Sequence, residues 1–206
     1  MFYLEKKHLL LINNMEQKHF INNKNIFSPC PEEHEEIFLG MGCFWGAEKL
    51  FWELDFIYVT SVGYGGGKKD NPSYQDVCSG TTNHVELVKI IYLDKKNNLP
   101  SILKIFWESH DPTQGMRQGN DVGTQYRSVI YTTTIEQFNT AEKSFDIYNS
   151  EVNKKLGKKI TTEIMSLPNF FYAEDYHQQY LAKNPEGYCG LNSLGIEFNQ
   201  NDLLDV

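Results

Sequence analysis

The chain has 206 residues, a length at which one substantial core is expected rather than two independent domains. Lys and Arg number 19 against 27 Asp and Glu, and the net charge of −8 disfavours nucleic acid as a partner, because a phosphate backbone is bound by a basic face. No apolar run reaches the roughly 18 residues that span a bilayer, so we expect no membrane segment.

Residues 1–36 are rich in Asn, Lys, Glu and His and follow no hydrophobic period. This predicts an N-terminal extension, partly disordered, ahead of a domain over residues 37–198 and a C-terminal end over 199–206. The apolar run Leu9–Ile12 is short and has no cleavage site, so no secretory signal is expected. The chain has four cysteines without a C-x-x-C pair, which argues against a zinc site and favours the reducing cytoplasm.

Regular patterns begin at residue 37. Residues 37–39 predict a strand, the glycines at 40 and 42 interrupt it, and a helix is expected from Cys43 to Leu54. A strand over 57–63 ends in the glycine run 63–67. Pro72 prevents a helix from opening on these glycines, so they do not form a dinucleotide loop. A further strand is predicted over 85–93.

The second half continues with a helix over 99–108 and a long polar loop over 111–125, of the kind that is usually functional or disordered. A strand over 126–133, a helix that starts at the capping box of Thr134 and Gln137, and a strand over 160–165 follow. A short helix over 173–182 precedes a flexible, glycine-bracketed coil. We therefore predict an α+β, two-layer sandwich with a split βαβ (ferredoxin-like) core, an added helix and strand, and a long coil tail.

Cys43 is the first candidate for chemistry, because it stands at a predicted helix start. Unpaired N–H groups and the helix dipole favour an anion there, so the thiol is expected to ionise readily and act as a nucleophile. Phe44 and Trp45 would place aromatic surfaces beside it, suited to an apolar or sulfur-bearing group. A buried cysteine that only fills space is the alternative.

Other candidates are weaker when taken singly. Cys189 lies on the coil tail and could discharge an oxidised Cys43 as a disulfide, or could be an inert surface thiol. Glu86 on the strand over 85–93 would ordinarily be solvated, and Asp121 fits a turn. Tyr74 and Tyr126 offer phenolic donors, although most tyrosines simply pack. The histidines show no metal-ligand spacing, so no metal is expected.

Together these residues resemble a known family. The segments from residue 37 to residue 195 look like the A-type peptide methionine sulfoxide reductases in the following motifs: Gly42-Cys43-Phe44-Trp45-Gly46, Asn71-Pro72-Ser73-Tyr74, Val77-Cys78-Ser79-Gly80, Phe106-Trp107-Glu108-Ser109-His110-Asp111-Pro112, Gly115-Met116-Arg117-Gln118-Gly119-Asn120-Asp121, Gly123-Thr124-Gln125-Tyr126-Arg127-Ser128, Phe171-Tyr172-Ala173-Glu174 and Gly187-Tyr188-Cys189-Gly190.

The resemblance implies that Cys43 attacks the sulfoxide sulfur of the S epimer of methionine sulfoxide, free or in proteins. Glu86, with a pKa raised by burial, would protonate the oxygen. Tyr74, Tyr126 and Asp121 would bind that oxygen, and Phe44 and Trp45 would hold the methyl group.

The sulfenic acid left on Cys43 would then be resolved as a disulfide by Cys189, which a thioredoxin-like partner reduces without any bound cofactor. No further cysteine follows Cys189, unlike in some members, so a single resolving thiol is expected. We separately expect the protein to be a monomer.

Two other functions stay open at this point. A cysteine hydrolase would use His110 or His177 as the base for Cys43 and would need no reductant. A redox-sensing domain would oxidise Cys43 without turning over sulfoxide.

Overall fold

The computed structural model describes residues 16–95 and 98–203. Its elements, in chain order, are β1 (His34–Met41), α2 (Phe44–Lys49), β2 (Ile57–Gly65), α3 (Tyr74–Cys78), β3 (Val85–Leu93), α4 (Asn98–Ser109), β4 (Arg117–Gln118), β5 (Asp121–Val122), β6 (Ser128–Thr132), α5 (Ile135–Leu156), β7 (Glu163–Ser166), β8 (Phe170–Tyr172) and α6 (Tyr180–Lys183). Short 3₁₀ turns, η1 to η3, occupy Thr124–Tyr126, Asp175–His177 and Gln200–Leu203.

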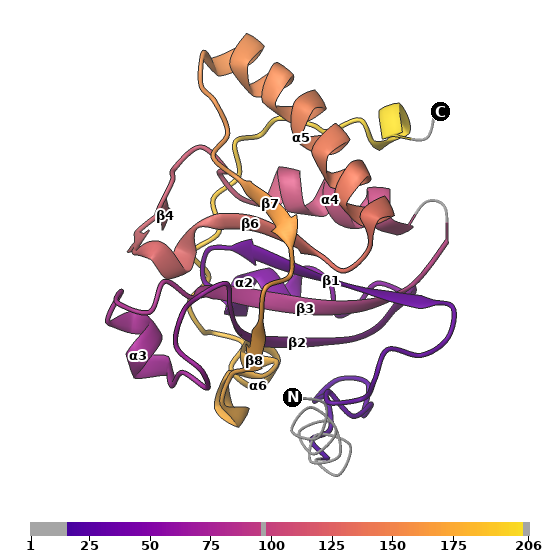
Figure 1. Cartoon of the computed structure of the whole chain (residues 1–206), viewed down its shortest axis with the longest axis vertical. Helices are drawn as coiled ribbons and strands as arrows, with labels where there is room; N and C mark the ends of the chain where they lie inside the picture. The colour runs from indigo at the N-terminus through magenta and orange to yellow at the C-terminus, as the bar shows by residue number, and fades with distance from the viewer. Residues whose placement is uncertain (1–15, 96–97, 204–206) are drawn as a thin grey trace.

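Six strands form one sheet in the order β7-β6-β1-β3-β2-β8. Strand β3 lies between β1 and β2 and runs antiparallel to both. Helix α2 connects β1 to β2 along the chain. Figure 1 shows β6, β1, β3 and β2 side by side, with α5 lying across the β6 end of the sheet. The predicted α+β class is confirmed. The predicted added strand corresponds to β7 at one edge of the sheet, whereas β8 at the other edge was not expected.

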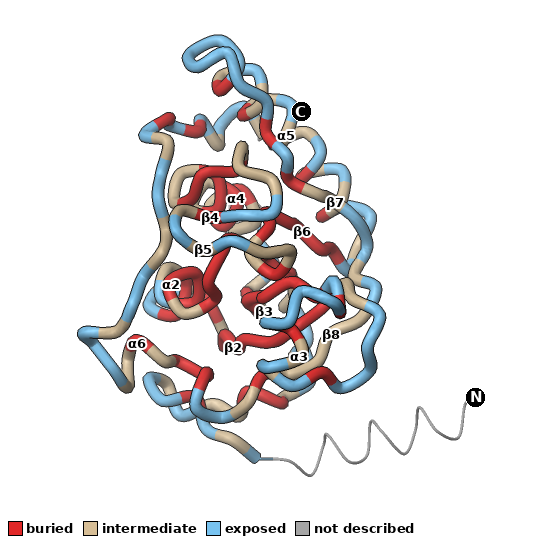
Figure 2. Tube along the Cα trace, turned by 90° about the vertical axis from the view of Figure 1, so that its left-hand side faces the viewer, coloured by how far each residue is buried: buried red, intermediate tan, exposed pale blue. Residues whose placement is uncertain are grey.

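Both faces of the sheet are covered. The main core packs α2, α4 and α5 on one face, through residues such as Phe44, Phe106 and Tyr148. A smaller cluster on the other face includes Phe38, Leu87 and Tyr131, against which Leu167 and Phe170 pack. This explains why the central strands are buried on successive residues rather than on alternate ones (Figure 2).

Local sequence patterns predicted most helices and strands, although some bounds differ from the prediction. Strand β3 has the predicted bounds, and Thr134 accepts a hydrogen bond from the backbone N–H of Gln137 at the start of α5. Helix α2 ends at Lys49, earlier than predicted, because residues 50–53 continue as turns. The long loop over 111–125 contains the small β4-β5 hairpin and η1.

The helix predicted over 173–182 is wrong, because two short pieces replace it. Gln179, between η2 and α6, adopts a left-handed backbone with φ of +47°, which interrupts a right-handed helix. Its backbone N–H and its side chain are both held by Glu48 of α2. A contact distant in sequence therefore breaks the helix, and no local pattern reports it.

Residues 1–15 of the predicted extension lie outside the described residues, whereas residues 16–33 pack on the domain. Ile26 is buried against Val59 and Ile91, and His19 is buried beside Thr60. At the other end, residues 184–199 contain no helix or strand, but this coil is anchored by Ile196 and Phe198 in the main core.

Candidate active site

Cys43 sits in the sharp connection between β1 and α2. Gly42, which precedes it, has φ of +97°, and a Cβ there would meet the side chain of Gln118 at 2.6 Å. Glycine is therefore required on both conformational and steric grounds. The connection holds the Cys43 side chain at the start of α2, where the thiol is buried with 8% exposure.

The electrostatic surroundings of Cys43 differ from the expectation. Burial raises the pKa of the Cys43 thiol and the charge of Glu86 adds to the rise, whereas the backbone N–H groups of Trp45 and Gly46 lower it by less. This direction is opposite to the expectation that the helix start ionises the thiol. A six-residue helix supplies little compensation against desolvation.

Glu86 is buried, not solvated. Its exposure is 2%, and its Oε2 accepts a hydrogen bond of 3.0 Å from the backbone N–H of Phe44. Burial raises the pKa of this carboxyl to about 8, and the charge of Asp121 contributes, while the Phe44 N–H opposes the change. A carboxyl that keeps its proton near neutral pH can act as a general acid, as the resemblance implied.

Tyr74, Tyr126 and Asp121 lie around the same carboxyl. They come from α3, η1 and β5, which are separate in the sequence. Burial raises the pKa of both tyrosines, and the charge of Glu86 raises each further. Asp121 Oδ2 is buried, and the Tyr188 hydroxyl of the C-terminal coil lies within hydrogen-bonding reach of the Asp121 carboxyl.

An aromatic wall stands beside the thiol. The Trp45 indole stacks on Tyr180 with ring centroids 3.9 Å apart, and its Nε1–H donates a hydrogen bond of 3.0 Å to His177 Nδ1. His177 also contacts the rings of Phe44 and Tyr74. These rings form an aromatic surface against which an apolar group can pack.

Cys189 reaches the site from the C-terminal coil. It is exposed and its thiol is free. A Cβ added at Gly46 would come within 2.7 Å of Cys189 Sγ, so this sulfur lies on α2, one helical turn beyond Cys43. A hollow of about 290 Å³ lies next to it, lined by residues 188–192 of the coil together with Gly119 and Asn120.

The structure therefore brings together all eight residues that the sequence singled out: Cys43, Phe44, Trp45, Tyr74, Glu86, Asp121, Tyr126 and Cys189. Sequence reasoning missed the support given by Tyr180 and Glu174. Glu174 accepts hydrogen bonds from the Tyr64 hydroxyl and the Tyr74 backbone N–H. Cys78 is exposed and lies within hydrogen-bonding reach of the Tyr74 hydroxyl.

Neither histidine is placed to serve a hydrolase. His110 uses one ring nitrogen on the Phe106 carbonyl and the other on the Ser128 hydroxyl. His177 accepts from Trp45 through Nδ1. Its Nε2 is buried without a hydrogen-bond partner among the described residues and lies 4.0 Å from Glu174 Oε2. A base paired with the nucleophile, which a cysteine hydrolase needs, is thus not provided by either candidate.

Residues 16–95 and 98–203 contain neither a candidate metal cluster nor a helix that could span a membrane. Over these ranges no cluster of three or more His, Cys, Asp or Glu could hold a metal ion. No helix in the same ranges is long and apolar enough to cross a bilayer.

A buried thiol, a carboxyl protonated near neutral pH and a second free thiol one helical turn away define a thiol-dependent redox site. Comparisons with known proteins agree. The family model for peptide methionine sulfoxide reductase matches residues 35–201. Relatives from Brucella anthropi and Maricaulis maris, both called peptide methionine sulfoxide reductase MsrA, are 53% and 55% identical over 86% of this chain and 82% of their own.

Solved structures show the same fold. Methionine sulfoxide reductase A of Corynebacterium diphtheriae has a TM-score of 0.79 and 42% identity, covering 88% of each chain. Reduced Mxr1 from Saccharomyces cerevisiae has a TM-score of 0.70 and 39% identity, covering 78% of this chain and 91% of its own.

The chain belongs to the peptide methionine sulfoxide reductase family, and it is an oxidoreductase of that family. The resemblance stated from the motifs is confirmed.

Proposed function

We propose that the chain reduces the S epimer of methionine sulfoxide, free or within proteins, through Cys43. The observation that carries the proposal is the pairing of a buried thiol with Glu86, whose raised pKa of about 8 leaves a proton available near neutral pH. Family membership supplies the substrate class. The surroundings of Cys43 are aromatic at Trp45 and Tyr180 and polar at Glu86 and Asp121, and this asymmetry favours one arrangement of methyl and oxygen around the sulfur.

In the first step, the Cys43 sulfur attacks the sulfoxide sulfur while Glu86 transfers its proton to the oxygen. This attack joins the two sulfurs. The sulfur–oxygen bond of the substrate then breaks with its electron pair on oxygen, and that oxygen attacks the Cys43 sulfur. The sulfur–sulfur bond breaks with its electron pair on the methionine sulfur, so methionine leaves and Cys43 is left as a sulfenic acid. The thiol proton of Cys43 restores Glu86. Tyr74 and Tyr126 would donate to the oxygen as charge develops on it, and Asp121 would support that network.

In the second step, the Cys189 thiol attacks the sulfenic sulfur, the Cys43–Cys189 disulfide forms, and water leaves. A dithiol reductant then reopens the disulfide by exchange and is itself oxidised. A thioredoxin-like protein fits this role in a reducing compartment such as the cytoplasm. A further structure of yeast Mxr1 contains it in complex with Trx2. All site residues come from one chain, so a monomer suffices.

The test follows each epimer of a methionine sulfoxide substrate by chromatography, with dithiothreitol as reductant, for wild type and Cys43→Ser. We expect wild type to consume the S epimer alone and Cys43→Ser to consume neither. Consumption of the R epimer would contradict the stereochemistry. Reversible oxidation of Cys43 without loss of either epimer would replace the reductase by a redox sensor.

Resolution by a single thiol has its own test. Cys189→Ser should still release one methionine per enzyme but should not turn over with a thioredoxin system. Turnover at the wild-type rate would disprove the role of Cys189 and direct attention to Cys30.

A further inference from the structure

Glu48 is a buried carboxyl on α2 that the proposed reaction does not use. Its exposure is 0%, and it accepts hydrogen bonds from the Thr60 hydroxyl at 2.8 Å, the Gln179 backbone N–H at 2.8 Å and the Gln179 side-chain amide at 2.7 Å. Three donors at these distances satisfy a buried carboxyl. Glu48 therefore ties the active-site helix to strand β2 and to the chain at residue 179.

Gln179 stands between the two residues that contact Trp45. His177 accepts the indole N–H at 3.0 Å, and Tyr180 stacks on the indole at 3.9 Å. The left-handed backbone of Gln179 sets how these two rings are placed relative to each other. Because Glu48 holds both the backbone and the side chain of Gln179, it controls the position of the aromatic wall without touching it.

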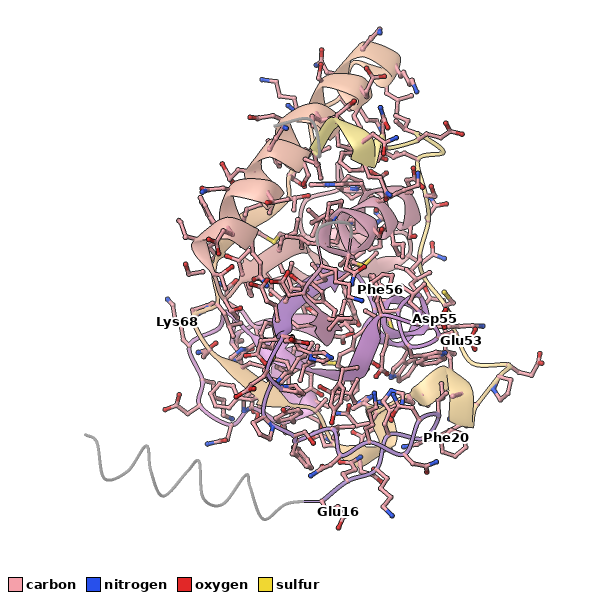
Figure 3. The ribbon with its side chains drawn as sticks, turned by 90° about the vertical axis from the view of Figure 1, so that its right-hand side faces the viewer. Glu16, Phe20, Glu53, Asp55, Phe56 and Lys68 are labelled. Atoms are coloured by element: carbon pink, nitrogen blue, oxygen red, sulfur yellow. The ribbon has the colours of Figure 1, made fainter. Side chains whose placement is uncertain are left out.

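The N-terminal segment completes this network. His19 Nδ1 accepts backbone N–H groups from Ile21 and Asn22, so its Nε2 carries the hydrogen that is donated to Thr60 Oγ1 at 3.0 Å. The Thr60 hydroxyl in turn donates to Glu48. The Phe20 backbone N–H donates to Gln179 Oε1 at 3.1 Å, and Figure 3 shows Phe20 beside α6.

We propose that residues 16–22, which precede the part of the chain matched by the family model, act as a positioning element for the aromatic wall that would receive the methyl group. His19 and Phe20 orient Thr60 and Gln179, these two residues engage Glu48, and Gln179 holds His177 and Tyr180 against Trp45. The inference deepens the proposed function, since it rests on Trp45 being the wall that receives the substrate methyl group. Its consequence is that the N-terminal segment sets how strictly the site selects methyl over larger groups.

The experiment compares kcat/KM for methionine sulfoxide and ethionine sulfoxide, which carries ethyl in place of methyl. One methylene in a defined pocket is discriminated by about tenfold or more. Thr60→Val keeps the volume but removes the hydroxyl that links His19 to Glu48. We expect it to reduce the preference for methyl about fivefold, on the scale of one methylene. Thr60→Ser, which restores the hydroxyl, should recover the wild-type ratio.

His19→Ala is the second test and does not depend on the folding of Thr60→Val. Like Thr60→Val, it should lower the ratio of kcat/KM for methionine sulfoxide to kcat/KM for ethionine sulfoxide. The matched control is Phe27→Leu, which weakens packing just after this segment on Val59, Ile91 and Tyr172 but leaves the network intact. This control should lower the melting temperature without changing the ratio.

An unchanged ratio in active Thr60→Val or His19→Ala enzyme would overturn the inference. An equal change in Phe27→Leu would do so as well, because general loosening would then explain the effect. Failure of wild type to reduce either sulfoxide would instead reject the proposed function, so the two failures are distinguishable.

Discussion

The sulfur of Cys189 lies in the space that a side chain on Gly46 would occupy. A Cβ on Gly46 would approach Cys189 Sγ to 2.7 Å and Leu191 Cγ to 3.3 Å. The third residue of α2 therefore has to be small for the C-terminal coil to bring its thiol over the helix that carries Cys43. Attack on sulfoxide and resolution of the oxidised thiol depend in this way on one turn of helix.

Gly46→Ala should slow resolution and leave the first chemical step intact. The added methyl displaces Cys189 and Leu191, whereas alanine itself favours the helical backbone by about 0.5–1 kcal/mol. Without reductant, the rate of methionine release reports the first step, attack on the sulfoxide. The rate at which free thiols disappear as the disulfide forms reports the second step, resolution by Cys189. Disulfide formation at the wild-type rate would show that the coil approaches Cys43 by another route.

Glu86→Gln should reduce kcat by about 10² to 10⁴, the usual contribution of a general acid. The amide keeps an acceptor for the Phe44 N–H but has no acidic proton. Since Glu86 has a pKa of about 8 and acts protonated, wild-type activity should fall as the pH rises through 8.

A pH–rate profile of wild type and Glu86→Gln, with circular dichroism to verify folding, provides the measurement. The variant should lack the limb near pH 8. Persistence of that limb in Glu86→Gln would assign it to another group.

Tyr74→Phe and Tyr126→Phe should each lower kcat/KM by about tenfold, because each removes one donor to the developing charge on oxygen while keeping the ring. Tyr74→Phe preserves the contact with His177, whose ring centroid lies 4.6 Å away. If the two hydroxyls act on the same oxygen, the double variant should lose less than the product of the single effects. Steady-state kinetics on the S epimer would measure this, and strictly multiplicative losses would indicate separate roles.

His110 should make the stability of the fold pH-dependent. It is fully buried, and burial lowers its pKa from 6.5 to about 4. Between these values the unfolded chain binds a proton that the folded chain does not, so stability is present above pH 6.5 and is lost as the pH falls toward 4. A pKa difference of this size between the folded and unfolded chain corresponds to a loss of about 3 kcal/mol in the free energy of unfolding.

Urea unfolding of wild type and His110→Asn across this range would measure the effect. The variant should be less stable throughout, since it loses the contacts with Phe106 and Ser128, and its free energy of unfolding should depend less steeply on pH. An unchanged slope would show that other groups, such as the buried His19 and His177, dominate.

Much of this protein is determined locally by its sequence. The bounds of β3, the capped start of α5 at Thr134 and the placement of Cys43 at a helix start follow from periodicity, capping and glycine chemistry. The motifs around Cys43, Tyr126 and Cys189 also identified the family. These features could be predicted because each depends on neighbours within a few positions in the chain.

The tertiary structure decided what depends on burial and on distant partners. Desolvation raises the pKa of Cys43 by more than the N–H groups at the helix start lower it. Burial also raises the pKa of Glu86 to about 8. Glu48 breaks the predicted helix at Gln179 across 131 positions of sequence, and His19 and Phe20 are brought into contact with Thr60 and Gln179. A sequence pattern records the residues, but the free energy of removing a charge from water is fixed only when the folded chain encloses it.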